Sequence, residues 1–322
     1  MNGDRRSTGD AVRTLFLGSG AFAVPILDAL AGAPEIRLVG VVTAPDRPSG
    51  RGTAVTPVPV ARRASELDLA VLQPETLRSP EAVAAVAALC PTLGVLADYG
   101  QIVPPSILAI PLHGILNVHP SALPRHRGAT PIQATIAAGD PIAAVTLIRL
   151  DEGLDTGPIV AQERWALDGT ETAATLEADA ARRGAALLRQ TLGPWLADDL
   201  PAVPQGPAGA TQTRPLRRED GRLDPGKTAL ELERQVRAHV PWPGSFVGTA
   251  HGRLIVHAAQ AVNEASGDRP GVLVTDGDGL ALTTAAGRLR LIRAQLAGRR
   301  PTDGASLRRG APGLVGQTVE LR

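Results

Sequence analysis

The residues best suited to chemistry lie in one segment, residues 114–128, which reads GILNVHPSALPRHRG. It opens as a short apolar run typical of a buried strand, and Asn117 and His119 fall where that run ends. Side chains two positions apart on an extended chain point to the same side. In an open α/β sheet, the carboxyl ends of the strands border the crevice that binds ligands. The segment therefore predicts an amide and an imidazole directed at one ligand.

A carboxylate follows the next apolar run of the chain. That run ends at Arg149 and continues as LDEGLDTGP, a glycine-rich loop that holds Asp151 and Asp155 and is expected at the same edge of the sheet. An amide, an imidazole and a carboxylate suit acyl transfer to an amine, because a developing oxyanion needs a donor and the attacking amine must lose a proton. A lone histidine after a strand is usually structural. The presence of Asn117 and Asp155 favours a catalytic interpretation.

Short apolar runs alternate with Ala- and Leu-rich segments over the first two hundred residues, which is typical of repeated βαβ units. The runs are continuously apolar, as expected for a parallel sheet covered on both faces. We therefore predict an α/β fold with a Rossmann-like, doubly wound and mostly parallel sheet. Its expected strands are 14–17, 38–43, 70–72, 93–97, 114–118 and 143–149, and its expected helices are 23–31, 58–67, 80–88, 132–138 and 172–196.

The chain changes character after the last of these helices. Residues 200–213, LPAVPQGPAGATQT, are rich in proline and lack an apolar period, so we predict a linker. A capping-box pattern at 228–231 then opens a helix, and short alternating runs between 245 and 294 predict a small OB-like antiparallel β-barrel. The expected domains are a mobile tail at 1–13, a catalytic domain at 14–199, the linker, and the barrel domain at 214–322.

Composition excludes several classes of protein. With 43% hydrophobic and 20% charged residues and no apolar run near the ~18 that cross a bilayer, we expect a globular protein without a membrane span. The first residues lack the apolar block of a signal peptide. Cys90 is the only cysteine, which rules out an internal disulfide, fits a cytoplasmic location and, in its apolar setting, predicts a buried structural thiol. The histidines lack metal-ligand spacing, so we expect no metal.

The net charge of +1 hides an asymmetry between the two ends of the chain. From Gln212 to Arg322 there are 17 Lys+Arg against 11 Asp+Glu, which leaves 16 basic and 21 acidic residues before them. A basic C-terminal domain is typical of a protein that docks a polyanion there. An ordinary solvated surface rich in arginine explains the charge equally well.

A dinucleotide fingerprint offers a rival interpretation. Residues 18–23, GSGAFA, follow an expected strand and open an expected helix, as in G-x-G-x-x-A. That fingerprint also requires an acidic residue at the end of the second strand. Here the strand ends near Thr43, and Asp46 lies beyond it in a loop rich in proline and glycine. We expect the glycines to permit a tight strand-to-helix turn and expect no nicotinamide cofactor.

The motif Asn117-x-His119-Pro-Ser-x-Leu-Pro, followed by Leu-Asp155-Thr-Gly, resembles the 10-formyltetrahydrofolate-dependent formyltransferases. Further segments resemble the branch of that family that formylates the methionyl group of initiator tRNA. They keep the same order and spacing from about residue 14 to the C-terminus, and they are TAPDRPSGRG at 43–52, YGQIVP at 99–104, RGATPIQ at 127–133 and PWPG at 241–244.

The resemblance implies catalytic roles for three residues. Asn117 is expected to hydrogen-bond the formyl oxygen as it becomes negative, His119 to stabilise the same oxygen, and Asp155 to orient His119 and help accept the amine proton. The resemblance also implies 10-formyltetrahydrofolate as the co-substrate, held largely by main-chain groups. The candidate folate-binding residues are Leu96, Ala97, Asp98, Tyr99 and Gly100 after one strand, Ser121, Leu123 and Pro124 at the turn, and Asp151 and Gly153 in the acidic loop.

Initiator methionyl-tRNA is the acceptor that the resemblance implies, and the family implies a monomer. Arg47 and Arg51 lie in a loop similar to the one that contacts the acceptor stem, and phosphate contacts by arginine supply affinity. Arg299 and Arg300 are candidates for a tRNA path on the barrel. Trp242, flanked by prolines, is expected to pack between helix and barrel.

Several positions depart from the family pattern, and rival functions stay open. Ala122, Asp98 and residues 53–54 differ from the usual types, which concerns folate and tRNA affinity more than the reaction class. A formyltransferase acting on a sugar-nucleotide amine shares the same three catalytic residues, and a formate-releasing hydrolase uses the same folate. A non-catalytic tRNA-binding module would explain the basic barrel but not those three residues. The PWPG segment and the basic C-terminal domain favour tRNA.

Overall fold

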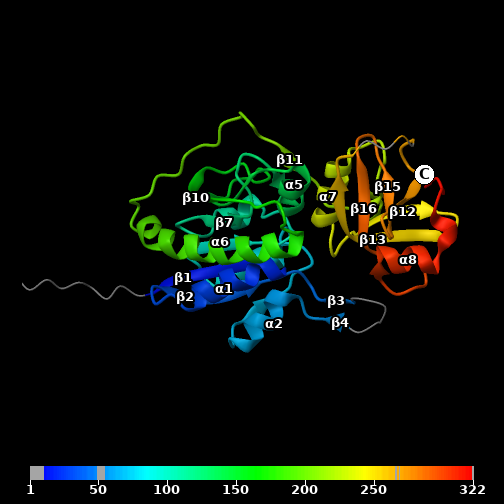
Figure 1. The fold of residues 1–322 in the computed structure, drawn as a ribbon. Coiled ribbons are helices and arrows are strands. Elements are labelled where there is room, and N and C mark those ends of the chain that lie inside the picture. Colours follow the sequence, from blue (N-terminus) through cyan, green and yellow to red (C-terminus); the bar gives the residue numbers. More distant parts are fainter. Residues whose placement is uncertain (1–10, 49–54, 265–266, 268, 321–322) are drawn as a thin grey trace, which may run out of the picture. The chain divides into compact units, whose positions relative to one another are not determined.

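The structure is a computed structural model that describes residues 11–48, 55–264, 267 and 269–320 of the chain (Figure 1). Its contacts divide the chain into two compact units. The first comprises Met1–Ala129, Ala144–Trp165 and Glu177–Gln212, and the second comprises Thr130–Ala143, Ala166–Leu176 and Thr213–Arg322. Two segments that the sequence places in the catalytic domain thus group with the C-terminal part.

A seven-stranded sheet forms the centre of the first unit, in the order β10-β9-β7-β6-β1-β2-β5. Neighbours from β7 to β5 pair in parallel, whereas β9 is antiparallel to β7. The strand order reverses between β6 and β1, the point at which such sheets bind ligands. The doubly wound, mostly parallel sheet is therefore confirmed. Its strands are β1 (Val12–Gly18), β2 (Ile36–Val42), β5 (Val71–Leu72), β6 (Leu93–Ala97), β7 (Ile115–His119), β9 (Ile142–Arg149) and β10 (Ile159–Ala166).

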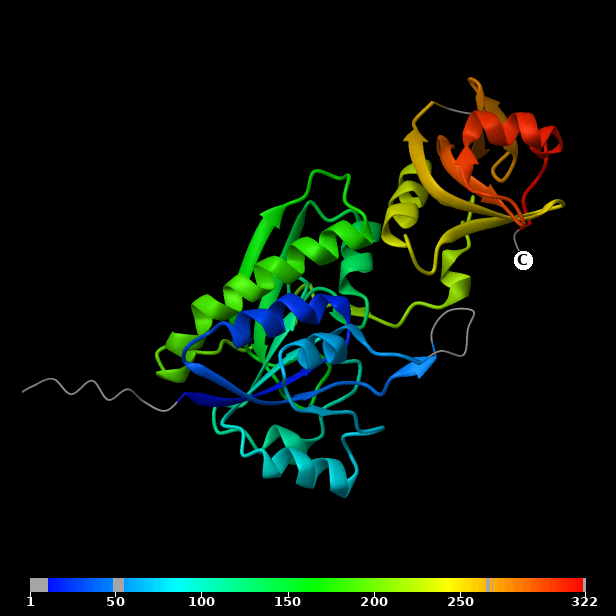
Figure 2. The same ribbon diagram turned by 90° about the horizontal axis from the view of Figure 1, so that it is seen from below.

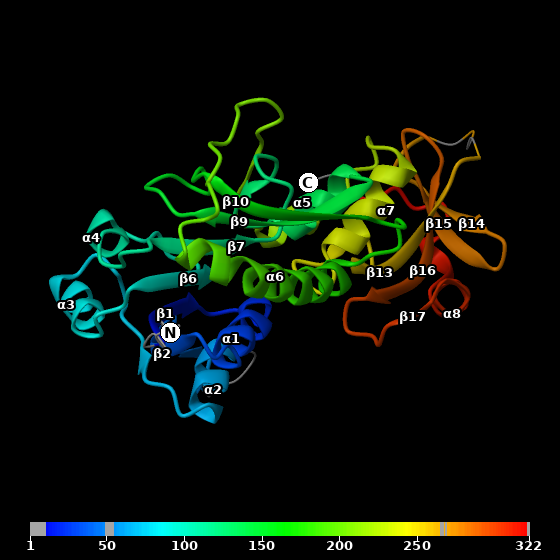
Figure 3. The same ribbon diagram turned by 90° about the vertical axis from the view of Figure 1, so that its left-hand side faces the viewer.

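Helices cover both faces of this sheet (Figures 2 and 3). On one face, Gly184 of α6 lies so close to Val118 and Val145 that an added Cβ would come within 2.7 Å of Val118. On the other face, Val86 and Ile107 join a buried cluster with Leu15 and Leu17 of β1. The remaining elements of this unit are η1 (Ala21–Ala23), α1 (Val24–Ala31), α2 (Pro59–Glu66), α3 (Pro80–Ala88), α4 (Pro105–Leu108), α6 (Ala173–Leu196) and the short pair β3 (Arg47–Pro48) and β4 (Val55–Thr56). Helix α5 (Pro131–Ala138) lies in a segment that groups with the second unit.

Three details of this unit differ from the predictions. β1 begins at Val12, so residues 12 and 13 belong to the sheet and not to a tail. β10 was not predicted, because an edge strand with one solvated face carries Glu163 and Arg164 and lacks a continuous apolar run. The predicted buried thiol of Cys90 is wrong: the residue follows the last turn of α3 with φ +44° and is exposed.

A small antiparallel barrel forms the core of the second unit, as predicted. Its strands pair in the order β12-β13-β16-β15-β14, and β17 pairs with β16. Two isolated antiparallel bridges add to this sheet: Glu320 pairs with Gly248 of β12, and Thr318 pairs with Val272 just before β14. α7 opens with the predicted capping box, in which Thr228 Oγ1 accepts from Glu231 N at 3.2 Å. The elements are η2 (Arg218–Gly221), α7 (Ala229–Ala238), β12 (Ser245–Thr249), β13 (Gly252–Val262), β14 (Leu273–Asp276), β15 (Gly279–Thr283), β16 (Arg288–Leu296), β17 (Thr302–Asp303), α8 (Gly304–Gly310) and η3 (Pro312–Leu314).

The segment predicted as a linker has fixed partners. Val203 forms a two-way backbone bridge with Ile159, at 2.7 and 2.8 Å. At its end, β11 (Gln212–Thr213) pairs with β8 (Arg127–Gly128). The prolines and glycines of residues 200–213 hide any periodic pattern of apolar residues, but they still allow individual backbone hydrogen bonds to other segments. The segment therefore contacts Arg127 and Gly128, which lie just after the motif that holds Asn117 and His119.

Candidate active site

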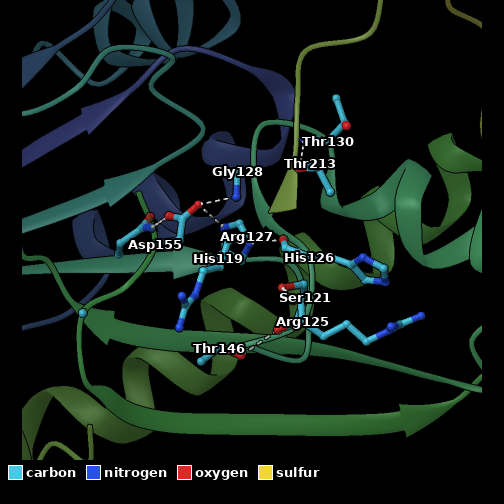
Figure 4. A network of polar contacts seen from close by, with 12 residues as sticks. His119, Ser121, Arg125, His126, Arg127, Gly128, Thr130, Thr146, Asp155 and Thr213 are labelled. Atoms are coloured by element: carbon cyan, nitrogen blue, oxygen red, sulfur yellow. Dashed lines mark hydrogen bonds and ion pairs between the residues drawn. The ribbon is translucent and has the colours of Figure 1, made fainter. Parts of the chain in front are cut away.

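The side chains of Asn117 and His119 both lie against the Asp155 carboxylate. Figure 4 shows His119 and Gly128 beside Asp155. Asn117 Nδ2 donates to Asp155 Oδ1 at 3.1 Å, and His119 Nδ1 lies 3.6 Å from Asp155 Oδ2. The backbone N–H of Gly128 donates to the same Oδ2 at 2.7 Å. Asn117 and His119 are each only 5% exposed, and the Asp155 side chain is 12% exposed. The structure thus brings together the three residues that the sequence selected.

The route by which Asp155 reaches this point differs from the expectation. β9 runs antiparallel to β7, so Arg149 at its end pairs with Leu116 near the start of β7. The carboxyl end of β9 therefore lies beside the amino end of β7, away from the carboxyl end of β7. Asp155 reaches Asn117 because the loop after β9 folds back over the sheet, with the backbone of Asp155 in the left-handed region at φ +53°. The expected convergence holds, but the premise of two parallel strand ends is wrong.

The proton on His119 is assigned by its partners. Nε2 lies 3.0 Å from the carbonyl oxygen of His126, and a carbonyl can only accept. Nε2 therefore carries the hydrogen, and Nδ1 is the nitrogen that faces the Asp155 carboxylate. This orientation leaves Nδ1 as the ring atom able to exchange a proton next to Asp155.

The turn after β7 is held by a buried threonine of β9 and a half-buried glutamine of β10. Thr146 Oγ1 donates to the Ser121 carbonyl at 2.6 Å, and Gln162 Nε2 donates both to that hydroxyl at 2.8 Å and to the Leu123 carbonyl at 3.2 Å. Ser121 Oγ donates to the Arg125 carbonyl at 2.7 Å, and the Pro124 carbonyl accepts from Thr211 N at 3.3 Å. The expected folate residues Ser121, Leu123 and Pro124 therefore already accept from protein donors. These bonds hold the turn that leads to His126, whose carbonyl oxygen lies 3.0 Å from His119 Nε2.

Residues 151–157 form a tight loop with little freedom. Asp151 Oδ1 accepts from Gly153 N at 3.1 Å and from Thr156 Oγ1 at 2.8 Å. A Cβ on Gly157 would lie 1.9 Å from the Arg149 carbonyl, so only glycine fits there. Asp151 and Gly153 are exposed. The loop presents an open rim to solvent while its Asp155 side chain turns inward.

The candidate folate segment after β6 adjoins Asn117 through the sheet. Leu96 pairs with Asn117, and Ala97 pairs with Gly18 on the other side. The Asp98 carbonyl accepts from Ser19 N at 2.9 Å and from Gly20 N at 3.3 Å. These bonds give the glycine fingerprint its expected role as a tight turn. A Cβ on Gly20 would also collide with the Asp98 carboxylate.

Burial shifts three ionisable groups near this crevice. Asp98 keeps an exposed surface, but its carboxylate lies against the Gly20 turn, and desolvation there raises its pKa. Desolvation also raises the pKa of Glu177, with a smaller contribution from the charge of Asp98. Burial raises the pKa of Tyr99 to about 12, and its hydroxyl, fully enclosed, has no hydrogen-bond partner among the described residues. All three groups therefore favour their protonated forms more than free side chains do.

A cavity of about 750 Å³ lies in the first unit beside this segment. Arg47, Arg62 and Glu75 line it together with Tyr99 and Gly100. It therefore joins a predicted tRNA residue to two predicted folate residues. The Arg47 side chain is 78% exposed and lies 3.9 Å from Glu75, a contact too open to restrain it strongly.

The remaining predicted tRNA residues are distributed differently. Arg299 and Arg300 are exposed on the barrel unit, where Arg299 Nη1 donates to the Gly310 carbonyl at 2.8 Å. Arg51 lies outside the described residues. Trp242 is 54% exposed, so its expected packing role is wrong. The described residues contain no cluster of three or more His, Cys, Asp or Glu able to hold a metal, and none of their helices is long and apolar enough to span a bilayer.

Comparison with known proteins agrees with this geometry. A formyl transferase family model matches residues 12–192, and the model of the family's C-terminal domain matches residues 215–312. A methionyl-tRNA formyltransferase of Roseiflexus sp. (strain RS-1) is 42% identical over 93% of this chain and 92% of its own length. The chain belongs to the methionyl-tRNA formyltransferase family. Family members of the same name from Halorhodospira halophila and Myxococcus xanthus are 42% and 41% identical over 96% and 94% of this chain.

Solved structures share the fold of this formyltransferase at much lower identity. An N-formyltransferase from Helicobacter canadensis, solved with folinic acid and dTDP-3-aminofucose, has a TM-score of 0.62 at 16% identity and covers 87% of this chain and 98% of its own. HypX from Aquifex aeolicus, solved with tetrahydrofolic acid, has a TM-score of 0.59 at 16% identity over 92% of this chain and 47% of its own. These likenesses establish the fold alone.

The sequence did not predict the polar side chains that hydrogen-bond the main chain near His119 and Asp155. Gln162 lies on the unpredicted strand β10, and Thr146 reads as an ordinary strand residue. Gln205 lies in the predicted linker yet bonds the backbone of the Asp155 loop. One signal was available: Gln205 is the only amide side chain in residues 200–211, a segment otherwise of small, apolar and proline residues.

Proposed function

We propose that this protein transfers the formyl group of 10-formyltetrahydrofolate to the α-amino group of methionyl initiator tRNA, with Asn117, His119 and Asp155 as its catalytic residues. The observation that supports this most is the contact of all three side chains around one carboxylate. Identity of 42% to methionyl-tRNA formyltransferases over nearly the whole chain supports the choice of substrates.

The proposed reaction needs one donor, one proton acceptor and one orienting group. The amine nitrogen attacks the formyl carbon, and the carbonyl electrons move to oxygen. Asn117 has a second amide hydrogen beyond the one given to Asp155, and this hydrogen suits that oxygen, a role worth about 10²- to 10³-fold in rate. The intermediate then collapses, the bond from carbon to the folate nitrogen breaks, and that nitrogen takes up a proton.

Asp155 is the proposed acceptor of the amine proton, directly or through Nδ1 of His119. The Gly128 N–H and the Asn117 amide both donate to its carboxylate and so hold the two carboxylate oxygens in fixed directions. His119 Nδ1 faces the same oxygen as Gly128, so imidazole and carboxylate can share the proton in transit. Such general acid–base catalysis contributes about 10²- to 10⁴-fold.

The two substrates are assigned to different groups of residues. Folate is assigned to the Leu96–Gly100 segment and the exposed rim of the Asp151 loop, which flank Asn117 and Asp155. Arg47, at the cavity that also reaches Tyr99, is assigned to the acceptor end of the tRNA. Arg299 and Arg300 are assigned to its outer phosphates. The proposal includes a monomer acting in the cytoplasm.

One assay separates this function from its rivals. The protein is incubated with 10-formyltetrahydrofolate and, in parallel, with methionyl initiator tRNA, a sugar-nucleotide amine or no acceptor. We expect N-formylmethionyl-tRNA as the main product, little formate and no formylated sugar. Faster formylation of the sugar nucleotide, or formate release independent of acceptor, would overturn the proposal.

A further inference from the structure

We propose that Gln205 is a positioning residue that sets the Asp155 carboxylate for formyl transfer; this inference rests on the function proposed above. Gln205 Nε2 donates to two carbonyls of the catalytic loop, that of Asp155 at 2.8 Å and that of Gly157 at 2.7 Å. Its Oε1 accepts from Nε and Nη2 of Arg127, at 3.1 and 2.7 Å. The Gln205 amide thus connects the loop that holds Asp155 to Arg127.

The chemistry of these partners fixes the orientation of the amide. Backbone carbonyls only accept and a guanidinium only donates, so the nitrogen must face the loop and the oxygen must face Arg127. Each hydrogen of the amide nitrogen has its own carbonyl. If the amide flipped, its oxygen would face two carbonyl oxygens and its nitrogen would face the Arg127 guanidinium, so every contact would be lost. Gln205 therefore has one stable arrangement.

This arrangement acts on a residue of the site whose backbone conformation is unfavourable. Asp155 has φ +53°, a region that non-glycine residues seldom occupy and that neighbouring contacts must maintain. The hydrogen bond from Gln205 fixes the direction of the Asp155 carbonyl, and with it the direction of the side chain. On the other side, Arg127 precedes Gly128, whose N–H donates to Asp155 Oδ2. Gln205 thereby holds both the Asp155 main chain and, through Arg127, the neighbouring Gly128 N–H that donates to the Asp155 carboxylate.

The main chain around Gln205 is anchored independently of its side chain. The two-way bridge between Val203 and Ile159 holds the segment two residues before Gln205, and Thr211 further along accepts from His126 N at 2.8 Å. Removal of the amide should therefore leave the segment in place. The side chain can be altered with the aim of changing the catalytic loop while the fold persists.

Three substitutions separate the hydrogen bonds that Gln205 donates to the Asp155 loop from those that it accepts from Arg127. Q205E keeps an acceptor for Arg127 but removes both hydrogens given to the loop and sets a negative charge beside two carbonyls. Q205L removes both sets of hydrogen bonds at similar volume, and Q205N keeps the amide but shortens its reach. Gln212, exposed in the same segment, supplies the matched control Q212A.

Single-turnover formylation of methionyl initiator tRNA is measured for each variant, together with KM for the tRNA and thermal unfolding. We expect Q205E and Q205L to lower the rate constant about 10- to 100-fold, because a shift of about 1 Å at a catalytic group has that effect. KM should stay within about twofold of wild type, and Q212A should match wild type. Unfolding midpoints should stay within about 3 °C. If Q205E fails to fold, Q205N carries the same test.

A double-mutant cycle with D155N decides whether Gln205 acts through Asp155. We expect Q205E to change the residual rate less than about twofold in the D155N background, because the group that it positions is already lost. Equal fold losses in both backgrounds, or a wild-type rate in Q205E, would overturn the inference. If instead the wild-type protein fails to formylate methionyl-tRNA, the proposed function itself fails, which is a separate outcome.

Discussion

The cluster around Asp155 and the barrel unit use polar residues in opposite ways. Around Asp155 the polar side chains are buried and engaged: the carboxylate has three partners, and His119 has one at each ring nitrogen. On the barrel, arginines such as Arg299 and Arg300 are exposed, and others pair with nearby carboxylates, as Arg288 does with Glu264 at 2.8 Å. The cluster depends on fixed geometry, whereas the barrel offers dispersed charge. Substitutions should therefore affect rate at the first and affinity or stability at the second.

Loss of the imidazole should have the largest effect. His119→Ala removes the group that shares the amine proton with Asp155, so we expect formyl transfer to fall about 10³-fold, within the range of general acid–base catalysis. His257→Ala, which alters a histidine of the barrel bonded to Gln295, should keep near-normal turnover. Turnover and circular dichroism of both variants are compared. If His119→Ala and His257→Ala lost turnover to the same extent, the proposed difference between the Asp155 cluster and the barrel would be wrong.

Loss of the amide donor should rank next. Asn117→Ala removes the proposed oxyanion donor and one hydrogen bond to Asp155, which predicts a decrease in kcat of about 10²-fold with little change in KM for the tRNA. Asn263→Ala changes an exposed asparagine of the second unit and serves as the control. A rise in KM with unchanged kcat would assign Asn117 to substrate binding instead.

The barrel arginines should produce a smaller effect of another kind. Arg300→Ala removes one exposed cation, so we expect KM for methionyl-tRNA to rise about 3-fold and the slope of log affinity against log salt to fall by about one. Arg253→Ala is the matched control, because Arg253 stacks 4.0 Å from the Phe246 ring centroid. An unchanged salt slope in Arg300→Ala would exclude a phosphate contact there.

A stability effect confined to the second unit should be the smallest. Arg214 donates two hydrogen bonds to Asp220 and, as the largest cause, lowers the pKa of that carboxyl to about 2. A depressed native pKa stabilises the fold above the unfolded pKa of about 3.9, and this contribution is lost as pH falls toward 2. Asp220→Asn should therefore lower stability by about 1 kcal/mol at pH 7, after allowance for the exposed Arg214, and by less below pH of about 3. Denaturant unfolding at pH 7, 4 and 3 checks this; a constant difference would contradict it.

The sequence was sufficient for the fold but not for every contact of the site. Continuous apolar runs predicted the parallel strands, because burial on both faces leaves no room for polar alternation. β10 was missed because an edge strand with one solvated face follows no such rule. Asn117 and His119 were predicted from their spacing on β7, and Asp155 from its loop, although β9 proved antiparallel. The contacts of Gln205 and Gln162 were not predicted, because each of them donates to backbone carbonyls of a distant loop, which no residue type marks.

The central claim is that the Asp155 carboxylate, held by Asn117, His119 and Gly128, serves the chemical step of formyl transfer. Asp155→Asn keeps the shape of this side chain while removing its charge, so single-turnover transfer with both substrates saturating isolates that step. We expect the rate constant to fall by about 10²-fold or more while the unfolding midpoint and tRNA binding stay near those of wild type. A folded Asp155→Asn protein that formylates methionyl-tRNA at close to the wild-type rate would contradict the account.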